Sequence, residues 1–359
     1  MSAASPERAM LAALQTLQRG EGLGAALMTA TMREIMAGTC EPAQIGALLM
    51  GLSQRRELLE EIVGAAAAMR EQVVRVPTTR RELLDTCGTG GSGIARRNVS
   101  TAVALCVAAC GHPVAKHGNR SAAGPCGSAD VLECLGLRLD ASAATVGACI
   151  DEVGVGFLFA PELHPAMRHA APVRKALGIR TLFNLLGPLC NPAFATRQLL
   201  GVYDPARTRE LAAALGQLGS TRVVVVHGFA EGVAADESAP WGIDDASPSG
   251  QTLVWELHGG ALTRRVITPA DAGLQPVPWS AIAGGSALHN AEALLRLLDG
   301  EPGPYRTAVA YSGALALLAA GDGPWSDLPR HARAIEAVLD DGRARTILAE
   351  LVAQSHQSR

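Results

Sequence analysis

The feature that most constrains the fold is the stretch from Asp85 to Thr101, which has the order strand, glycine turn and helix start. The apolar pair Leu83-Leu84 leads into it, four glycines stand between residues 88 and 93, and an apolar run follows at 102–110. Glycines allow positive φ and let a ligand approach the backbone closely. A helix start offers unpaired N–H groups and a partial positive charge, which together suit a phosphate.

This stretch alone leaves two interpretations open. Asn98, Ser100 and Thr101 can cap the helix of an ordinary strand–helix turn, or they can donate to a bound anion. The glycine spacing does not fit the dinucleotide fingerprint, and the Lys-Ser/Thr ending of a P-loop is missing. A second stretch lies close behind, with Lys116-His-Gly-Asn-Arg120 followed by Gly127-Ser-Ala-Asp-Val-Leu-Glu133.

Taken together, the two stretches resemble the anthranilate phosphoribosyltransferase family. That family carries Gly-Thr-Gly-Gly, Asn-x-Ser-Thr, Lys-His-Gly-Asn-Arg and Gly-Ser-Ala-Asp in this order. The likeness covers most of residues 10–350 and is dense between 85 and 204. Further matching blocks are Gly156–Pro161, His164–Met167, Ala171–Arg174, Phe183–Pro188, Asn191-Pro192 and Gln198–Tyr203.

Composition excludes several other classes of protein. Apolar residues make up 48% of the 359 residues and aromatic residues only 3%, so leucine, valine and alanine must form the core. A net charge of −3 without a basic run argues against a nucleic-acid surface. The apolar stretches are broken by polar residues well short of a membrane span. Eight scattered cysteines and no recognisable signal peptide favour a reducing cytoplasm.

The chain has two kinds of periodicity. Apolar residues recur at helical spacing over 7–18, 24–37, 42–52 and 57–73, which predicts an α-helical domain over 1–78. From residue 79 to 359, short apolar strands alternate with helices, which predicts an α/β domain with a mostly parallel sheet. By resemblance, the fold is of the nucleoside phosphorylase and phosphoribosyltransferase type, and residues 165–190 return to the helical domain. The individual elements are expected as strands at 83–86, 113–116, 155–159, 198–203 and 222–226, a β-like patch at 252–266, and helices at 101–110, 128–136, 141–153, 205–218, 288–299, 304–320 and 328–354.

The resemblance implies an enzyme of tryptophan biosynthesis. It would transfer the phosphoribosyl group of 5-phosphoribosyl-1-pyrophosphate to anthranilate and release pyrophosphate. The transition state is oxocarbenium-like, so the protein must hold both phosphate ends, neutralise the leaving group with Mg²⁺ and position the amine. No general base is expected, because an aromatic amine attacks unprotonated at neutral pH. The implied partners are these small molecules and a second copy of the chain in a homodimer.

Three sets of site residues follow from the resemblance. The donor phosphates would lie against Gly88, Gly91, Ser92, Arg96, Asn98, Ser100, Thr101, Lys116 and Ser128. The anthranilate would lie against Gly88, His117, Asn119, His164 and Arg174, whose guanidinium would pair with the carboxylate. The metal would be held by Ser100, Asp236 and Glu237, since hard oxygen ligands suit Mg²⁺. The acidic loop is longer than the family's Gly-Leu-Asp-Glu pattern, which leaves its register open.

Most departures from the family pattern fall on the donor side. Ser92 stands where the family usually has aspartate, and Arg96-Arg97 replace a threonine and an apolar residue. Residues 122–125, Ala-Ala-Gly-Pro, replace a loop with two serines and a lysine, and Ser312-Gly313 replace Asn-Ala. We hypothesise that Arg96 or Arg97 restores part of the anion binding; the alternative is that both point to solvent. Two other functions stay open, a paralogue with another aromatic or heterocyclic acceptor and a non-catalytic binding protein with an impaired donor site.

Overall fold

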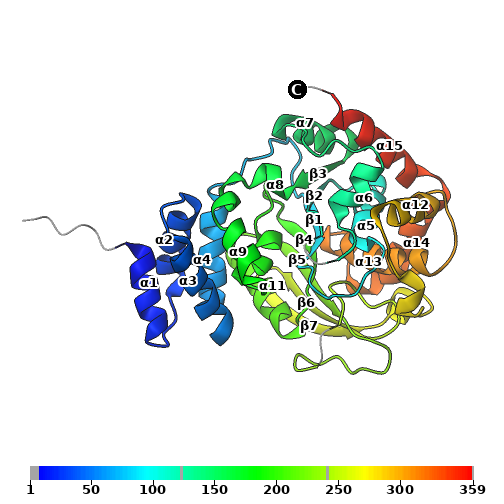
Figure 1. The fold of residues 1–359 in the computed structure, drawn as a ribbon. Helices are drawn as coiled ribbons and strands as arrows, with labels where there is room; N and C mark the ends of the chain where they lie inside the picture. The colour runs from blue at the N-terminus through cyan, green and yellow to red at the C-terminus, as the bar shows by residue number, and fades with distance from the viewer. Residues whose placement is uncertain (1–7, 122–123, 240–241, 358–359) are drawn as a thin grey trace, which may run out of the picture. The chain divides into compact units, whose positions relative to one another are not determined.

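A computed structural model of the chain describes residues 8–121, 124–239 and 242–357. The chain divides into two compact units (Figure 1). The helical unit comprises the chain up to Val74 together with Pro161–Cys190. The α/β unit comprises Arg75–Ala160 and the chain from Asn191 onward. The prediction of a helical domain beside a larger α/β domain is confirmed.

The helical unit is built on four helices whose apolar faces meet. These are α1 (Ala9–Gln18), α2 (Gly24–Met36), α3 (Pro42–Arg55) and α4 (Leu59–Arg70). Helices α2 and α4 pack closely because Gly64 has no side chain, and a Cβ there would overlap the Ala25 carbonyl oxygen. The later segment adds α9 (Ala171–Leu177), which packs on α3, and α10 (Leu182–Leu186), which packs on α3 and α4. Short turns complete it, at η2 (Pro165–His169) and η3 (Gly187–Leu189), while α8 (Ala160–Leu163) begins at the boundary.

A seven-stranded sheet forms the centre of the α/β unit, in the order β3-β2-β1-β4-β5-β6-β7. The strands are β1 (Leu84–Gly88), β2 (Val114–Gly118), β3 (Val155–Phe159), β4 (Arg197–Gly201), β5 (Arg222–Gly228), β6 (Thr252–His258) and β7 (Ala261–Ile267). The first five are parallel, and β6 and β7 are antiparallel. The parallel strands therefore end at one common edge, which is where ligands bind in open α/β sheets.

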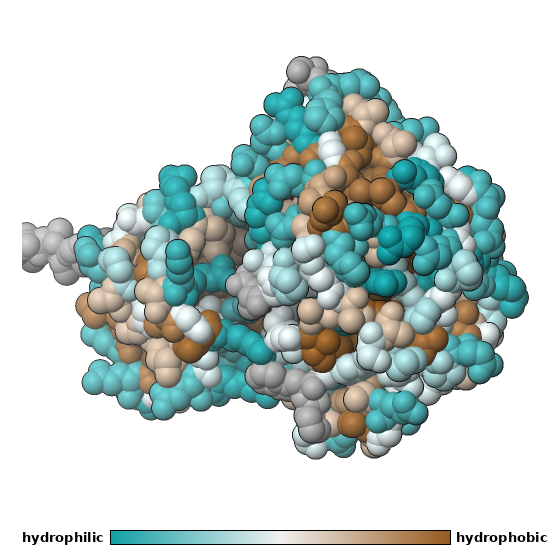
Figure 2. Space-filling view, turned by 45° about the vertical axis from the view of Figure 1, so that its right-hand side comes forward, coloured by the Kyte–Doolittle hydropathy of each residue, from teal (hydrophilic) through white to brown (hydrophobic). Residues whose placement is uncertain are grey.

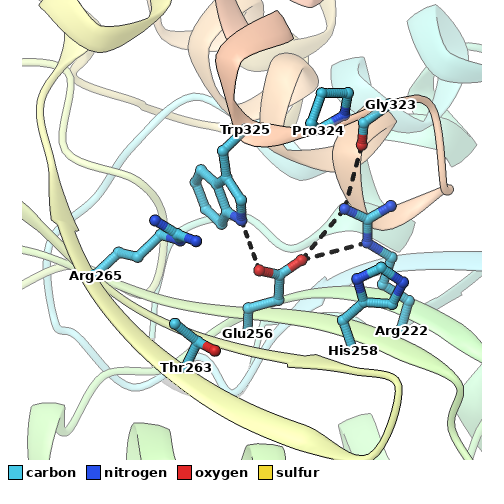
Figure 3. A pocket seen from close by; sticks show the side chains of 8 residues that line it. All are labelled: Arg222, Glu256, His258, Thr263, Arg265, Gly323, Pro324 and Trp325. Carbon is cyan, nitrogen blue, oxygen red and sulfur yellow. Dashed lines mark hydrogen bonds and ion pairs between the residues drawn. The ribbon is translucent and has the colours of Figure 1, made fainter.

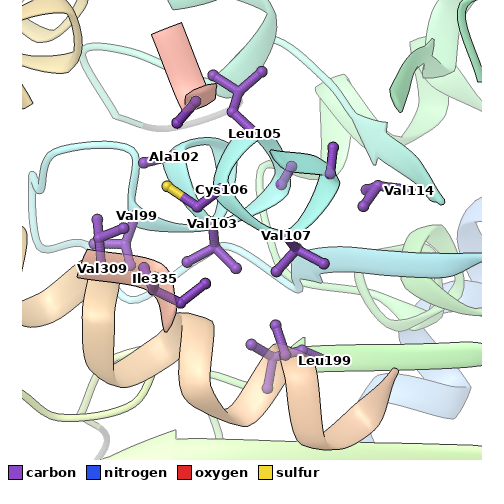
Figure 4. Close-up of a cluster of buried hydrophobic side chains, with 14 of the residues drawn as sticks. Val99, Ala102, Val103, Leu105, Cys106, Val107, Val114, Leu199, Val309 and Ile335 are labelled. Atoms are coloured by element: carbon purple, nitrogen blue, oxygen red, sulfur yellow. The ribbon is translucent and has the colours of Figure 1, made fainter. Parts of the chain in front are cut away.

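The helices of this unit lie around the sheet, and several of them pack directly on its strands. They are α5 (Val99–Ala109), α6 (Ser128–Cys134), α7 (Ala143–Ala148), α11 (Thr208–Gln217), α12 (Ala287–Leu298), α13 (Pro304–Ala319), α14 (Leu328–Asp340) and α15 (Arg343–Ser355). Helix α5 is apolar on all sides because it packs on β1 and β2 as well as on α13, α14 and α15. Figure 4 shows Val103 and Val107 of α5 beside Leu199 of β4 and Ile335 of α14. The glycine turn is thus joined to a helix that is almost entirely buried.

Two predicted helices differ from the observed ones. The helix expected over 141–153 is α-helical only to Ala148 and continues as a π-helical turn, η1 (Cys149–Val153). The helix expected over 328–354 is two helices, because Gly342 takes a left-handed conformation (φ 76°) between them. Helical periodicity continues through both breaks, so apolar spacing alone does not reveal them.

Hydrophobic and hydrophilic side chains are interspersed on the surface. Hydrophobic residues (brown) are interrupted by hydrophilic ones (teal) over the face in Figure 2. Among the described residues, no helix is long and apolar enough to cross a membrane.

Gly313, near the middle of α13, gives a test of this packing. Alanine normally stabilises a helix over glycine by roughly 0.5–1 kcal/mol. A Cβ at Gly313, however, would lie 2.7 Å from Ile335 Cγ1, and overpacking costs typically about 1–3 kcal/mol. We expect Gly313→Ala to lower the urea midpoint of unfolding. The control is Gly46→Ala in α3, where the nearest atom would be Val173 Cγ1 at 3.7 Å. That variant should keep or raise the midpoint, and equal behaviour of the two would contradict the packing.

Candidate functional site

The predicted glycine turn lies at the end of β1, on the common edge of the parallel strands. Gly90, Gly91 and Gly93 have φ of 66°, 86° and 72°, a conformation that other residues rarely adopt. The Thr89 N–H donates to the carbonyl oxygen of Gly201, at the end of β4 (2.9 Å). The turn is therefore tied to the neighbouring strand and leads directly into α5.

The start of α5 presents three polar side chains. The Asn98 side-chain oxygen accepts a hydrogen bond from Asn290 Nδ2 (2.9 Å), and its backbone oxygen accepts one from the Tyr305 hydroxyl (3.1 Å). The Thr101 hydroxyl is buried and has no hydrogen-bond partner among the described residues. Asn290 is a site-positioning residue that the sequence reasoning missed, because it lies 192 residues away in α12. Its hydrogen bond orients the Asn98 amide at the helix start.

Lys116 brings a buried positive charge to the same place. Only 3% of the residue is exposed, and its ammonium group donates to the Thr86 carbonyl oxygen (2.5 Å) and to Ser100 Oγ (3.3 Å). Burial lowers the pKa of Lys116, while the negative charges of Asp85 and Asp245 act in the opposite direction. The structure thus joins Ser100 and Lys116, two residues that the sequence assigned to the donor phosphates.

Asp85 supports this arrangement from inside the sheet. Its carboxyl accepts hydrogen bonds from the His117 N–H (3.0 Å) and from Asn191 Nδ2 (2.8 Å). Burial raises the pKa of Asp85 to about 6, although these donors and Lys116 lower it. Asp85 and Asn191 were matched in the sequence without a role, and the structure shows that they brace β2 at His117.

The loop after β2 holds Asn119 and Ser128. The Ser128 hydroxyl donates to the Asn119 carbonyl oxygen (3.3 Å) at the start of α6. Arg120 pairs with Asp130 (3.0 Å) and Glu133 (2.7 Å) of that helix. Ala122 and Ala123, two of the altered loop residues, lie outside the described residues, whereas Gly124 and Pro125 are exposed.

The acids expected to hold a metal, Asp236 and Glu237, have partners elsewhere. Asp236 accepts a hydrogen bond from the Ser238 N–H (2.6 Å), and Glu237 pairs with Arg264 of β7 at 3.0 Å. β7 is the edge strand of the sheet, and β4, β5 and β6 separate it from β1. These two side chains therefore lie beside β7, with partners of their own.

A second acidic pair, Asp244-Asp245, lies against the glycine turn. The Gly90 N–H donates to Asp244 Oδ2 (2.9 Å), and the preceding Ile243 bridges the end of β5 at Gly228. Gly242-Ile-Asp-Asp245 also follows the Gly-Leu-Asp-Glu pattern more closely than Ala234-Ala-Asp-Glu237 does. This second pair is an alternative to Asp236-Glu237 that the sequence reasoning did not consider.

Arg96 lies between these acids. Its Nη2 is 2.8 Å from Asp244 Oδ1 and 3.1 Å from Asp245 Oδ2, and its Nη1 donates to Ser92 Oγ (2.9 Å). Burial alone would raise the pKa of Asp244, but the charge and hydrogen bond of Arg96 outweigh it and lower that pKa. Burial and the charge of Asp244 raise the pKa of Asp245.

The two arginines that replace family residues thus have different surroundings. Arg96 faces carboxylates, whereas the guanidinium carbon of Arg97 lies 5.3 Å from the centroid of the Tyr305 ring. Neither side chain points simply to solvent in this structure. The hypothesis that one of them binds the donor phosphate stays a prediction, and Arg96 would first have to leave its two carboxylates.

His164 and Arg174, expected on the acceptor side, belong to the helical unit. His164 is buried, and burial lowers its pKa to about 4. Arg174 lies in α9 with its guanidinium carbon 5.2 Å from the Phe183 ring centroid, and burial lowers its pKa as well. The remaining acceptor residues, Gly88, His117 and Asn119, lie at the ends of β1 and β2 in the α/β unit.

A cavity of about 470 Å³ lies at the opposite end of the sheet (Figure 3). The Arg222–Glu256 ion pair (3.2 Å) and Trp325, which donates to Glu256 (2.5 Å), form its wall. Arg222 begins β5, whereas the glycine turn lies where the parallel strands end. None of the predicted site residues, all of which the structure describes, lines this cavity. The side chains that converge on the strand ends, rather than this cavity, form the candidate active site.

Comparison with known proteins identifies chains of the same two-part organisation. Residues 80–345 match the family model described as "Glycosyl transferase family, a/b domain". Residues 11–73 match the one described as "Glycosyl transferase family, helical bundle domain". The chain is similar to the anthranilate phosphoribosyltransferase of Desulforamulus reducens, with 45% identity over 95% of each chain. It is also 44% identical to that of Symbiobacterium thermophilum, over 98% of this chain and 99% of the relative.

Solved structures show the same likeness. Anthranilate phosphoribosyltransferase from Thermus thermophilus superposes with a TM-score of 0.87 and 42% identity, over 96% of this chain and 99% of that one. The enzyme from Saccharomyces cerevisiae, in complex with PRPP and Mg, has a TM-score of 0.83 and 26% identity. These alignments cover 97% of this chain and 98% of the yeast chain.

Buried His164 predicts a pH dependence of stability. Its pKa of about 4 lies below the ordinary value, so the unfolded chain binds more protons between about pH 6.5 and 4. Its contribution to the free energy of unfolding is therefore present above pH 6.5 and lost as the pH falls through this window. The loss is on the order of 3 kcal/mol. We expect the midpoint of denaturation to depend less on pH between pH 4 and 6.5 in His164→Gln than in the wild type. The control changes the exposed His356 to glutamine and should leave the pH dependence of the midpoint as in the wild type. An unchanged pH dependence in His164→Gln would refute the assignment of this effect to His164.

Proposed function

The chain belongs to the anthranilate phosphoribosyltransferase family, and from that premise we propose that it transfers the phosphoribosyl group of 5-phosphoribosyl-1-pyrophosphate to anthranilate. Pyrophosphate is released, and the reaction is a step of tryptophan biosynthesis. The observation that carries the proposal is the meeting of buried Lys116 with Ser100 at the helix start above the glycine turn. The two alternatives, another acceptor or a binding protein without activity, have no comparable support.

The donor phosphates would bind at the start of α5. A Cβ on Gly90 or Gly93 would meet no atom within 4 Å, so the backbone is open there, and the positive end of the helix dipole favours an anion. Lys116 adds a full charge, and a charge-assisted hydrogen bond contributes roughly 1.5–3 kcal/mol. The buried Thr101 hydroxyl would gain the partner that it lacks among the described residues. Asn98, held by Asn290, would present its remaining amide donor to the same anion.

Residues of the chain fit a magnesium ion, but the proposed acidic ligands come later in the loop after β5 than the pair that the sequence predicted. Mg²⁺ prefers one or two carboxylates together with substrate phosphates. Asp244, Asp245 and Ser100 would hold it, in place of the predicted Asp236 and Glu237, because the former pair lies beside the glycine turn. When bound, the ion would neutralise charge on the leaving pyrophosphate.

The acceptor would be positioned rather than activated. Arg174 would pair with the anthranilate carboxylate, and Asn119 and His117 would lie near the amine. An arginine–carboxylate pair can be bidentate and so orients a flat acid as well as binding it. Holding the amine against C1 of the ribose would contribute to the rate through proximity and orientation. The amine nitrogen forms the new bond to C1 as the bond from C1 to the pyrophosphate oxygen breaks, and the proton that the nitrogen then loses passes to water or to the released pyrophosphate.

A homodimer and a cytoplasmic location stay predictions. Exposed hydrophobic side chains of the helical unit are candidates for an interface between two copies, because contiguous apolar patches mark association surfaces. Leu11 and Met50 are 46% and 48% exposed, and they lie on α1 and α3, which contact each other.

The direct test of the proposal is to incubate the protein with anthranilate and phosphoribosyl pyrophosphate and to detect the product by chromatography. We expect the wild-type protein to form phosphoribosyl anthranilate. Arg174→Ala should raise the KM for anthranilate by about tenfold or more, since a lost charged hydrogen bond costs roughly 1.5–3 kcal/mol. The KM for phosphoribosyl pyrophosphate should change little. If both constants rise equally, Arg174 has a structural role, and if wild type forms no product the proposal fails.

The position of the metal is tested by two variants in which acids are changed to amides, one at each candidate acidic pair. Asp245→Asn should raise the Mg²⁺ concentration needed for half-maximal activity, because it removes one of the two proposed charged ligands. Asp236→Asn combined with Glu237→Gln should leave this concentration unchanged. The opposite pattern would return the metal to the loop beside β7. Melting temperatures of both variants, measured without metal, separate loss of ligand from loss of fold.

A further inference from the structure

Arg96 fills the acidic pair that would otherwise be open to a cation. Its guanidinium contacts Asp244 at 2.8 Å and Asp245 at 3.1 Å, and all three side chains are at most 18% exposed. A guanidinium offers several donors in one plane and so can satisfy two carboxylates at once. At a low-exposure site, the Coulombic attraction between the charges is stronger than on the surface, and removing one partner leaves the other charge buried and uncompensated.

The backbone around Arg96 is fixed from the opposite side. Arg96 forms a β-bridge with Ala283, and the N–H groups of Arg97 and Gly284 donate to Ile282 (3.0 Å) and Ala95 (3.1 Å). A side chain on Gly284 would collide with the Arg96 carbonyl group. Any rearrangement of Arg96 must therefore come from its side-chain torsions, while its Cα stays beside the acids.

The charges allow only one cation between the acids at a time. Asp244 and Asp245 carry two negative charges, Arg96 supplies one positive charge between them, and Lys116 also acts on Asp245. A divalent ion bound to the same oxygens would stand against the guanidinium, and like charges at contact distance in a buried place repel strongly. By the resemblance, position 96 would carry an uncharged threonine, and a side chain of that type could not compete with a cation in this way.

We propose that Arg96 is an internal counter-cation, which occupies the Asp244–Asp245 pair in the substrate-free protein and must leave it before a divalent cation binds there. The inference rests on the metal position proposed above. It makes Arg96 a positioning residue that sets the metal requirement. The bare protein then binds Mg²⁺ weakly, and the ion enters when the substrate's phosphate oxygens are present as further ligands and as an alternative partner for Arg96.

The test is calorimetric titration of MgCl₂ into the full-length protein without substrates. Arg96→Thr restores the family residue type and should bind Mg²⁺ about tenfold more tightly than wild type or better, the effect of one lost charged hydrogen bond. Arg97→Thr removes the neighbouring positive charge, which faces Tyr305 rather than the acids. This control should bind as wild type does. Equal affinity of wild type and Arg96→Thr, including no binding by either, overturns the proposal.

A melting experiment covers the case in which Arg96→Thr folds poorly. Two uncompensated buried carboxylates should lower its melting temperature without metal, and MgCl₂ should restore it, with a larger shift than in wild type. Arg96→Lys keeps one charge with fewer fixed donors and should give an intermediate Mg²⁺ affinity. A lower melting temperature that Mg²⁺ does not restore, together with wild-type affinity in Arg96→Lys, contradicts the inference. These experiments measure metal binding and melting, not turnover. Their result can therefore be interpreted even if the protein does not catalyse the proposed reaction.

Discussion

The candidate site depends on one close contact, between the loop 242–247 and the ends of the parallel strands. A Cβ on Gly88 would lie 2.7 Å from Asp244 Oδ2, one on Gly201 would overlap the Asp244 carbonyl oxygen, and one on Gly228 would lie 2.6 Å from the Asp245 carbonyl oxygen. These three glycines close β1, β4 and β5. Because the strand ends lack side chains, the acidic loop can lie directly on them and reach the glycine turn.

Sequence reasoning predicted the fold well because local patterns carry it. The valines at 223–226 are buried on both faces of the sheet and so form an unbroken apolar run. The glycine turn and the polar start of α5 were likewise visible as neighbours in the chain. Lys116 and Ser100 were predicted to share a ligand through resemblance, and their contact in the structure supports that pairing.

Contacts that join distant segments could not be predicted in the same way. Asn290 holds Asn98 across 192 residues, and no local pattern marks it. The metal was expected at Asp236 and Glu237 by resemblance, with the register of the loop left open, and only the fold shows that Asp244 lies against the glycine turn. The partners of Arg96 are also distant in the chain, and a charged residue in a loop is usually solvated, so the sequence contains no sign of these ion pairs. Only the three-dimensional packing shows that both acids face it.

The division of the chain has a consequence for its covalent connectivity. Since the helical unit is built from two separate segments, the backbone changes unit three times, at Val74, Ala160 and Cys190. Removing the first segment would strip α9 and α10 of the helices α3 and α4 on which they pack. An expression fragment beginning at Arg75 would thus carry an unpaired apolar insertion between β3 and β4. The two units are therefore inseparable by a single cut, and a fragment with one intact unit requires excising 161–190 and rejoining the ends.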